Sequence, residues 1–259
     1  MQISFSKYHG TGNDFIIIDN RDGSINLSIN QIKHLCDRRF GIGADGLLLL
    51  NSIADFDFEM KYYNADGAEG SMCGNGGRCI TQFAYDIGIK KEQYHFIATD
   101  GPHDAFFGTN NWIHLKMINV SSINKIHNDY VLNTGSPHYI TEVSNINNLN
   151  VVKEGQAIRY SNNFKEKGIN VNFIQKEANK IIVRTYERGV EDETYSCGTG
   201  VTAASLVFAK NETGFNRIEV ETKGGQLAVE FDKKGDQEFN NIWLCGPAVF
   251  VYKGSVELN

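Results

Sequence analysis

The amino-acid sequence predicts a mixed α/β (α+β) fold of two pseudo-symmetric domains, each with strands wrapped around a central helix. Cys73-Gly74-Asn75-Gly76 opens one helical pattern, and Cys197-Gly198-Thr199-Gly200 opens a second. Short strand-like runs precede and follow each motif. We expect domains at residues 1–117 and 118–259, with an active-site cleft between them and with the last ten or so residues able to return to the first half.

Local signals place the elements of the first half. Ser28 followed by Gln31 forms a capping-box pattern, which predicts a helix from this point. Apolar and polar residues alternate over 56–62, as in a strand with one buried face. After Cys73, apolar residues recur at i, i+3, i+4 and i+7 and stop at Gly88, which predicts an amphipathic helix. Cys73 should therefore lie at a helix N-terminus.

The same pattern returns at a nearly constant distance along the chain. Tyr63 and Tyr186 are 123 residues apart, and Cys73 and Cys197 are 124 apart. The second helical stretch, 201–210, is apolar nearly all round, as expected of a helix enclosed by strands. Two copies at this spacing predict two similar domains, since a solenoid needs at least about three short repeats.

Composition narrows the class of function. The net charge of −6 gives no electrostatic footprint for nucleic acid or for an anionic membrane, so a small-molecule partner is favoured. The first residues show no secretion signal, and the apolar runs have strand length rather than bilayer length. Five cysteines in such a chain indicate reduced thiols, so we expect the protein in the cytoplasm.

Cys73 and Cys197 are the candidate catalytic residues. A helix dipole stabilises a thiolate at its N-terminus by about 0.3–1 kcal/mol, which brings thiol and thiolate both within reach near neutral pH. One cysteine could then act as base while the other acts as acid. Two such groups facing one carbon would remove a proton from one side and return one to the other, inverting the configuration.

A thiolate is too weak a base to deprotonate an amino-acid α-carbon unaided. The backbone N–H groups of Gly74, Asn75, Gly198 and Thr199 are expected at two helix starts, where they suit a carboxylate that becomes enolate-like. At about 3 kcal/mol for each well-placed donor, these groups would outweigh the base itself. No cofactor is needed for this chemistry.

Alternative interpretations exist for several of these residues. A single Cys-Gly at a helix start is more often structural than catalytic, but two matched copies favour function. Cys73 and Cys79 lack a partner pair at zinc-ligand spacing, so no metal site is predicted. Glu187-Arg188 could be a surface ion pair or could hold a polar substrate end, and His138 could be a loop histidine or could tune a thiol.

Together these motifs resemble the diaminopimelate epimerase family, and the likeness covers nearly the whole chain. The matching stretches are His9-Gly10-Thr11-Gly12-Asn13-Asp14-Phe15, Gly41-Ile42-Gly43-Ala44-Asp45-Gly46, Asn64-Ala65-Asp66-Gly67, Cys73-Gly74-Asn75-Gly76, Glu187-Arg188-Gly189 and Cys197-Gly198-Thr199-Gly200.

The resemblance implies an isomerase that needs no pyridoxal phosphate and interconverts LL- and meso-diaminopimelate in lysine and peptidoglycan precursor biosynthesis. It also implies a homodimer. Cys73 and Cys197 would transfer the proton, and His138 and Glu187 would modulate the thiols. The implied substrate-binding residues are Asn13, Asn64, Gly74, Asn75, Asn170, Glu187, Arg188, Gly198 and Thr199, with Arg188 pairing with the distal carboxylate.

Two positions and one spacing depart from the family pattern. Ser136 stands where the family usually has asparagine, so an amide contact to the distal end could be lost or mediated by water. At Gly46, where some members carry glutamine, no contact is carried over. Glu187 and Cys197 lie one residue further apart than expected, so the family pattern does not predict the conformation of the loop 190–196.

Two rival functions remain. A proline or hydroxyproline racemase would share the cysteines, but a cyclic substrate without a second charged end has no use for Glu187-Arg188 with Asn64 and Asn170. The other rival is a non-catalytic protein, either a thiol redox sensor or an amino-acid-binding protein.

Overall fold

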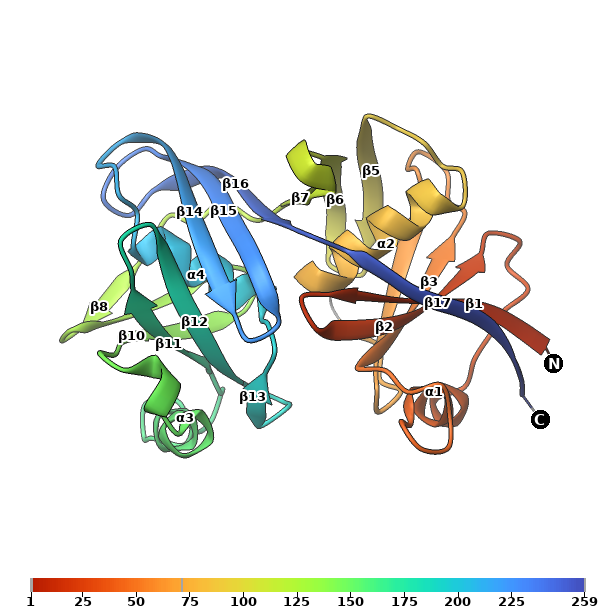
Figure 1. The fold of residues 1–259 in the computed structure, drawn as a ribbon, viewed down its shortest axis with the longest axis horizontal. Helices are drawn as coiled ribbons and strands as arrows, with labels where there is room; N and C mark the ends of the chain where they lie inside the picture. Colours follow the sequence, from red (N-terminus) through yellow and green to blue (C-terminus); the bar gives the residue numbers. More distant parts are fainter. Residues whose placement is uncertain (1, 71, 259) are drawn as a thin grey trace. The chain divides into compact units, whose positions relative to one another are not determined.

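The computed structural model describes residues 2–70 and 72–258, so Ser71, two positions before Cys73, lies outside the described residues. The chain forms two compact units (Figure 1). The first combines Met1–Leu115 with Pro247–Asn259, and the second is Lys116–Gly246. We propose these units as the domains, in place of the limits 1–117 and 118–259 drawn from the sequence.

The first unit contains two α-helices and a curved set of strands. Its elements are β1 (Gln2–Gly10), β2 (Asn13–Asn20), α1 (Ile29–Cys36), β3 (Gly46–Asn51), β4 (Glu59–Asn64), α2 (Gly74–Asp86), β5 (Gln93–Ala98), β6 (Gly101–Phe107), the 3₁₀ turn η1 (Thr109–Asn111), β7 (Ile113–Lys116) and β17 (Val249–Glu257).

The second unit repeats this plan. Its elements are β8 (Asn124–Ile126), β9 (Asp129–Asn133), β10 (Pro137–Glu142), the 3₁₀ turn η2 (Ile146–Asn148), α3 (Val151–Arg159), β11 (Asn170–Lys176), β12 (Lys180–Glu187), β13 (Asp192–Thr194), α4 (Gly198–Val207), β14 (Gly214–Thr222), β15 (Gly225–Lys233) and β16 (Phe239–Gly246).

The two units share one strand order. In the first, β17, β1, β2, β3, β4, β5, β6 and β7 are successive neighbours, and only the pairs β2–β3 and β4–β5 are parallel. In the second, the order is β8, β9, β10, β11, β12, β14, β15 and β16, and the parallel pairs are β10–β11 and β12–β14. The predicted duplication and the mixed α/β class are therefore confirmed.

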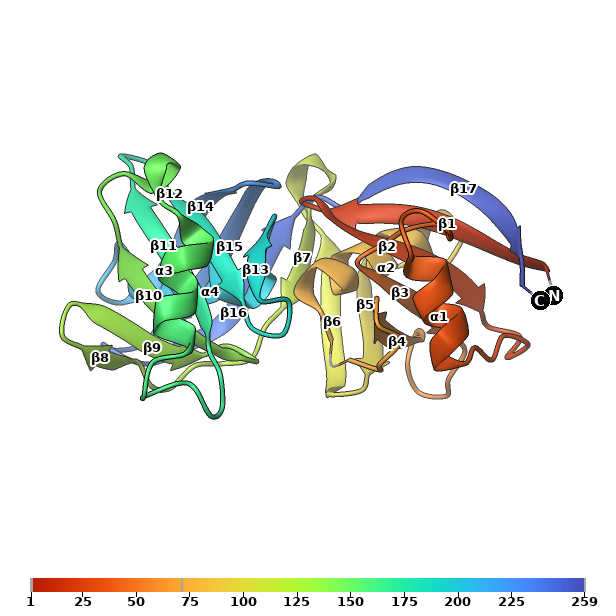
Figure 2. The ribbon, with the colours of Figure 1, turned by 90° about the horizontal axis from the view of Figure 1, so that it is seen from below.

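A central helix is enclosed by the strands of each unit (Figures 1 and 2). Helix α2 packs against β1, β2, β3 and β4, and helix α4 against strands from β9 to β16. Because strands surround α4, apolar or small side chains cover nearly its whole circumference, as the sequence predicted. The helix ends at Val207, three residues before the predicted end.

The other helices lie outside the strands. Helix α1 begins with the predicted capping box of Ser28 and Gln31, and its Ile32 and Leu35 pack with Ile16 and Leu47 in one buried cluster. Helix α3 is capped by Asn150 and covers a second cluster in the other unit. Each unit thus has an outer layer that holds the strands around the central helix. No helix among the described residues is both long and apolar enough to cross a bilayer.

Candidate active site

Cys73 is the N-cap residue of α2. It has an extended backbone, with φ −100° and ψ 126°, and the first helical hydrogen bond runs from the Gly77 N–H to the Cys73 carbonyl oxygen over 2.7 Å. The N–H groups of Gly74, Asn75 and Gly76 therefore precede the hydrogen-bonded part of the helix, where the helix dipole is positive. The predicted location of this thiol at a helix N-terminus is confirmed.

Cys197 has the same position in the second unit. It is the N-cap residue of α4, with φ −115° and ψ 108°, and its carbonyl oxygen accepts from the Val201 N–H over 2.9 Å. The N–H groups of Gly198, Thr199 and Gly200 come before that bond. The Cys197 residue is 8% exposed, so its thiol lies in a partly dry environment.

An asparagine from β2 contacts the first thiol. Sγ of Cys73 lies 3.6 Å from Oδ1 of Asn13, and Nδ2 of Asn75 donates to the same oxygen over 3.2 Å. Nδ2 of Asn13 donates to Oδ2 of Asp45 over 2.8 Å. Three predicted site residues, Asn13, Cys73 and Asn75, are thus brought together within the first unit.

Arg78 on α2 is fully buried behind this group. Its Nη2 donates to Oδ1 of Asn75 over 2.9 Å and approaches Oγ1 of Thr11 at 3.4 Å, and its Nη1 lies 3.4 Å from the Gly74 carbonyl oxygen. Such a cation is costly to bury, so these contacts bind Arg78 firmly to the start of the helix. Arg78 was not among the predicted site residues, although an arginine three positions after Asn75 on a buried helix was a usable signal.

The second thiol contacts a network of hydroxyl groups. Oγ1 of Thr199 lies 3.5 Å from Sγ of Cys197 and 3.2 Å from Oγ of Ser136. The Thr134 hydroxyl donates to the Thr199 carbonyl oxygen over 2.8 Å, which fixes the first turn of α4. Ser136 is therefore part of the surroundings of Cys197.

His138 on β10 is fully buried beside that network. Its Nε2 lies 2.9 Å from Oγ of Ser136, and its Nδ1 lies 3.1 Å from Nδ2 of Asn172. Burial, and to a smaller extent the charge of Arg188, lowers the pKa of His138 to about 3. The imidazole is neutral near pH 7, so it acts on the site as a hydrogen-bonding group rather than as a cation.

Asn170 and Arg188 meet where β11 begins and β12 ends. The Arg188 N–H donates to Oδ1 of Asn170 over 2.9 Å, and Nδ2 of Asn170 donates to Oγ of Ser136 over 3.1 Å. The Arg188 side chain donates to the Lys167 carbonyl oxygen over 3.0 Å. Glu187, Asn170 and Arg188 therefore lie at one end of neighbouring strands, close to the Ser136 network.

The structure also describes the loop 190–196, whose conformation the sequence did not predict. Strand β13 pairs with β12, with Glu187 opposite Asp192, and the Glu191 N–H donates to the Glu187 carbonyl oxygen over 2.8 Å. Gly189 and Glu191 both have positive φ, at 92° and 58°. A left-handed turn of this kind accommodates the longer spacing to Cys197.

Asn64 is held in a local turn at the end of β4. The Tyr62 hydroxyl donates to Oδ1 of Asn64 over 2.8 Å, and the Asn64 N–H donates to the Ala68 carbonyl oxygen over 2.9 Å.

The remaining cysteines are buried thiols. None of the five cysteines forms a disulfide in the described part of the chain, and Cys36, Cys79 and Cys245 are inside the units. Burial raises the pKa of Cys36 to about 12 and raises that of Cys79 further. Cys36, Cys79 and Cys245 are therefore packed core residues.

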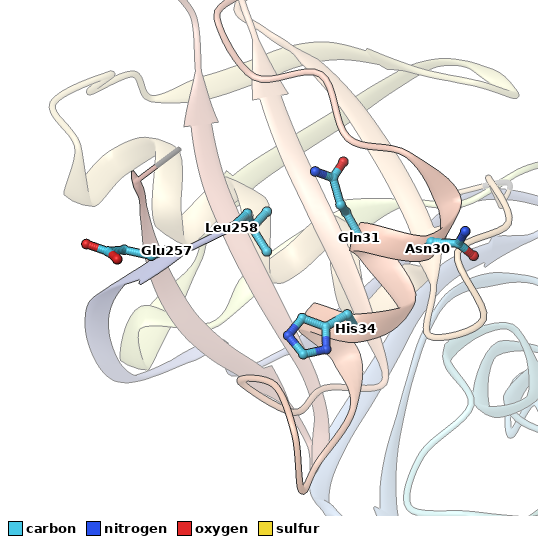
Figure 3. Close-up of a pocket in the computed structure, with 5 residues that line it drawn as sticks. All are labelled: Asn30, Gln31, His34, Glu257 and Leu258. Carbon is cyan, nitrogen blue, oxygen red and sulfur yellow. The ribbon is translucent and has the colours of Figure 1, made fainter.

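A small pocket of the first unit lies apart from the thiols (Figure 3). It has a volume of about 240 Å³ and lies between α1 and the residues that end β17. Its lining residues are Asn30, Gln31, His34, Glu257 and Leu258. None of these belongs to the predicted site.

Comparisons with known proteins identify the family. The sequence model of the family described as diaminopimelate epimerase matches residues 5–103 and 130–251. A curated diaminopimelate epimerase of Flavobacterium psychrophilum is 49% identical over 257 residues, covering 96% of this chain and 98% of the relative. The chain belongs to the diaminopimelate epimerase family. A second family member, from Chlorobaculum tepidum, is 42% identical over 259 residues, covering 96% of this chain and 99% of its own.

Solved structures show that the fold of this epimerase family extends further. A PhzF-family phenazine biosynthesis protein of Bacillus anthracis superposes with a TM-score of 0.76 at 15% identity, covering all of both chains. A hydroxyproline epimerase of Agrobacterium vitis superposes with a TM-score of 0.71 at 12% identity, covering 98% of this chain and 92% of the other. At these identities the likeness concerns the fold alone.

Two further residues of the site were missed by the sequence analysis. Asn172 lies two positions after Asn170 on β11, and because side chains at i and i+2 share one face of a strand, the pattern Asn-x-Asn was a usable signal. Thr185 on β12, whose hydroxyl donates to Oδ1 of Asn172 over 2.9 Å, had no local signal at all. Its role depends on the pairing of β11 with β12.

Proposed function

We propose that this member of the diaminopimelate epimerase family interconverts LL- and meso-2,6-diaminopimelate, as an isomerase of lysine and peptidoglycan precursor biosynthesis. The observation that carries the proposal is the matched placement of Cys73 and Cys197, each at the N-cap of the central helix in one of two units with the same strand order. The 49% identity to a curated diaminopimelate epimerase over nearly the full chain supports the substrate.

The proposed mechanism is a proton transfer between two thiols on opposite faces of the α-carbon. The thiolate of one cysteine takes the α-proton and becomes a thiol, and the thiol of the other gives its proton to the opposite face and becomes a thiolate. The electron pair left on the α-carbon spreads into the adjacent carboxylate. Charge is conserved and no group is oxidised or reduced, so the proposed reaction needs no redox cofactor.

The helix N-termini supply the stabilisation that the weak base lacks. The N–H groups of Gly74, Asn75, Gly198 and Thr199 precede the first helical hydrogen bonds of α2 and α4. We propose that these groups bind the reacting carboxylate, where each well-placed donor contributes about 3 kcal/mol to the transition state.

The distal end of the substrate requires its own partners. We propose that Asn64, Asn170, Glu187 and Arg188 bind the second amino and carboxylate groups, together with Asn13. In support, Asn170 and Arg188 are joined by a 2.9 Å hydrogen bond, and Glu187 lies beside them at the end of β12. His138 and Glu187 are proposed to modulate the thiols rather than to bind directly to the reacting carbon.

We propose further that the protein is a homodimer of the cytoplasm. Val249, Phe250, Val251 and Tyr252 form a continuous exposed apolar run on β17, between 41% and 50% exposed, which is unusual for a surface strand. A second copy of this chain would cover the run. Sedimentation at several concentrations tests the proposal, and Val251→Lys should favour the monomer.

The decisive experiment is α-proton exchange in deuterated buffer with LL-diaminopimelate, under reducing conditions and without added cofactor. Deuterium should enter as the meso isomer forms. Cys73→Ala and Cys197→Ala should each reduce turnover by roughly 10²–10⁴-fold, whereas the buried-thiol control Cys36→Ala should retain it. Exchange with proline or hydroxyproline instead would make the protein a racemase of another substrate, and no exchange with any amino acid would favour a binding or redox role.

A further inference from the structure

The hydrogen bonds around each thiol have directions that can be assigned, because each network contains groups that only donate or only accept. An arginine donates, and a carboxylate or carbonyl oxygen accepts. These groups fix the orientation of each asparagine amide, and the assignment then passes from one residue to the next as far as the sulfur. Each network lies within one unit.

In the network around Cys73, the group that faces the sulfur is a hydrogen-bond acceptor. Nη2 of Arg78 can only donate, so the atom of Asn75 that it contacts at 2.9 Å is Oδ1, and Nδ2 of Asn75 faces Asn13. Asp45, which also pairs with Arg38 at 2.7 Å, can only accept, so the atom of Asn13 at 2.8 Å from it is Nδ2. The amide oxygen of Asn13 therefore faces Cys73.

An amide oxygen has no hydrogen to give. The hydrogen between Oδ1 of Asn13 and Sγ of Cys73, 3.6 Å apart, must be carried by the sulfur. A thiolate at this place would instead face the negative end of the amide dipole. The surroundings of Cys73 thus favour its protonated form.

The second network begins at Asn172, whose amide orientation is also fixed. One atom of that amide lies 3.1 Å from the Tyr139 carbonyl oxygen, which only accepts, so this atom is Nδ2. Oδ1 then accepts from the Thr185 hydroxyl over 2.9 Å. The second hydrogen of Nδ2 is directed at Nδ1 of His138, so Nδ1 is unprotonated and the ring hydrogen is on Nε2.

The hydrogen bonds of Ser136 run in the same donor-to-acceptor direction. Its Oγ accepts from Nε2 of His138 over 2.9 Å and from Nδ2 of Asn170 over 3.1 Å. The orientation of Asn170 is fixed because its Nδ2 also lies 3.2 Å from the Pro137 carbonyl oxygen while its Oδ1 accepts from the Arg188 N–H. A hydroxyl group accepts two hydrogen bonds and donates one, so Ser136 donates its own hydrogen to Oγ1 of Thr199, 3.2 Å away.

Thr199 is the last residue in this series of hydrogen bonds. Having accepted from Ser136, its hydroxyl is left with its own hydrogen, and Sγ of Cys197 lies 3.5 Å from the oxygen. A hydrogen bond donated to sulfur stabilises the thiolate, and successive hydrogen bonds with the same direction strengthen one another. The surroundings of Cys197 thus favour its ionised form.

We propose that in the substrate-free protein Cys197 rests as the thiolate and Cys73 rests as the thiol, and that Ser136 and Arg78 are the positioning residues that set this difference. The inference deepens the proposed function and rests on it. The resting protein is then ready for the stereoisomer whose α-hydrogen faces Cys197. That turnover protonates Cys197 and leaves Cys73 as the thiolate.

Charged and titratable groups act on both thiols, and Glu187 at the end of β12 is one of the two residues proposed to modulate them. Arg78 and Asp45 reach Cys73 through the asparagines, and the Cys79 thiol interacts electrostatically with Cys73. Beside Cys197, His138 is neutral above a pKa of about 3, and the charge of Arg188 acts on His138. Since the pKa of Cys36 is about 12 and that of Cys79 is raised further, neither should ionise in the range that matters.

The test measures the ionisation of each thiol without substrate. Ultraviolet absorbance of the thiolate is followed from about pH 5 to 10 in Cys73→Ala, which retains Cys197, and in Cys197→Ala, which retains Cys73. We expect the midpoint of Cys197 to lie at least about one pH unit below that of Cys73. Equal midpoints, or the reverse order, would overturn the proposal.

Variants of the chain give the matched control. In the Cys73→Ala background, Thr199→Val and Ser136→Ala should each raise the midpoint of Cys197 by about one pH unit, because each interrupts the donors that reach the sulfur. Thr202→Val on the same helix removes a buried hydroxyl that donates to the Gly198 carbonyl oxygen, and it should leave the midpoint unchanged. If the Thr199→Val midpoint equals that of the Cys73→Ala parent, the proposed series of hydrogen bonds to Cys197 is wrong.

A second measurement uses the unaltered protein and so does not depend on any variant folding. Each cysteine is labelled with iodoacetamide at a series of pH values and its labelling rate is read by mass spectrometry. The pH midpoint of each rate reports ionisation regardless of exposure, and that of Cys197 should be the lower. The expected order without isotope exchange would count against the proposed function alone, whereas exchange with the reverse order would count against this inference alone.

Discussion

Nδ2 of Asn172 donates to Nδ1 of His138 over 3.1 Å, and both residues are completely buried. The contact selects one tautomer of a neutral imidazole, because an amide nitrogen cannot accept a hydrogen bond from a protonated Nδ1. A histidine that is often considered as a proton carrier is thereby converted into a fixed donor. Its Nε2 hydrogen is directed at Ser136, toward the thiol of the second unit.

The first prediction concerns the stability that Asn172 supplies. Asn172→Ala leaves the hydroxyl of Thr185, Nδ1 of His138 and the Tyr139 carbonyl oxygen without this partner in a buried place. We expect a loss of about 2–4 kcal/mol in the free energy of unfolding, since each unsatisfied buried group costs roughly 1–3 kcal/mol. Urea denaturation measures it. The exposed control Asn163→Ala should change the value by less than about 0.5 kcal/mol.

The second prediction concerns pH. The pKa of His138 is lowered to about 3 in the folded protein, so below the ordinary histidine value the unfolded chain binds a proton that the folded chain does not. Stability should therefore fall as the pH drops from about 6.5 toward 3, with a contribution near 1.4 kcal/mol per pH unit. His138→Gln should remove this contribution to the slope, and the exposed control His34→Gln should retain it. An unchanged slope in His138→Gln would contradict the prediction.

The third prediction concerns Asp14 on β2. Nζ of Lys7, 5% exposed, lies 2.7 Å from one carboxylate oxygen, and Nη2 of Arg38 lies 2.7 Å from the other. Burial alone would raise the pKa of Asp14, but Arg38 and Lys7 hold it well below its usual range. This stability is present above the ordinary carboxyl pKa and is lost as the pH falls through the lower folded value.

Asp14→Asn leaves the Lys7 ammonium buried without its anion. We expect a loss of about 3 kcal/mol near neutral pH, measured by thermal or urea unfolding. Asp19→Asn is the matched control, because Asp19 pairs with Arg21 at the surface, and it should cost less than about 1 kcal/mol. Similar losses in the two variants would mean that Lys7 finds another partner.

The fourth prediction compares equivalent glycines of the two central helices. Gly76 and Gly200 each follow a site cysteine by three positions. A Cβ atom added at Gly200 would lie 2.2 Å from Oδ1 of Asn172 and 3.4 Å from Sγ of Cys197. A Cβ added at Gly76 would have the flexible end of Met60 as its nearest neighbour, at 3.3 Å, and would lie at ordinary contact distances of 3.5 Å from Cβ of Cys73 and 3.6 Å from Cδ2 of Leu48.

Gly200→Ala should therefore displace Asn172 and reduce turnover at least about tenfold, whereas Gly76→Ala should reduce it by less than about threefold. Steady-state kinetics of epimerisation measure both. Circular dichroism shows whether each variant keeps its fold. A greater loss for Gly76→Ala would place the sensitive packing around α2 instead.

Local signals were enough to predict the elements that carry the thiols. The positions of Cys73 and Cys197 at helix starts, the capping box of Ser28 and the helix end before Gly88, whose φ is 96°, depend on neighbours a few residues away. The duplication was visible because the same local signals occur twice. Helix starts and turns are the features that sequence patterns encode most directly.

The hydrogen-bond networks could not be predicted in the same way. Asn172 receives its partners from β10 and β12, and Arg78 reaches Thr11 across 67 positions of the chain. Such contacts depend on strand register, and a shift of one residue would direct Asn172 to the other face of β11. Strand β13 was missed for a related reason, since the turn before it requires a positive φ at Glu191, which has no distinctive local sequence.

The pairing of β1 with β17 has a consequence for synthesis of the protein. Gln2 pairs with Glu257 and His9 with Val249. One edge of β1, the first strand to be synthesised, therefore remains unpaired until β17 has been synthesised near the end of translation. Until then the backbone of β1 has an open edge beside apolar side chains, which favours association between unfinished chains. The second unit, continuous from Lys116 to Gly246, can complete its fold while the first is still open.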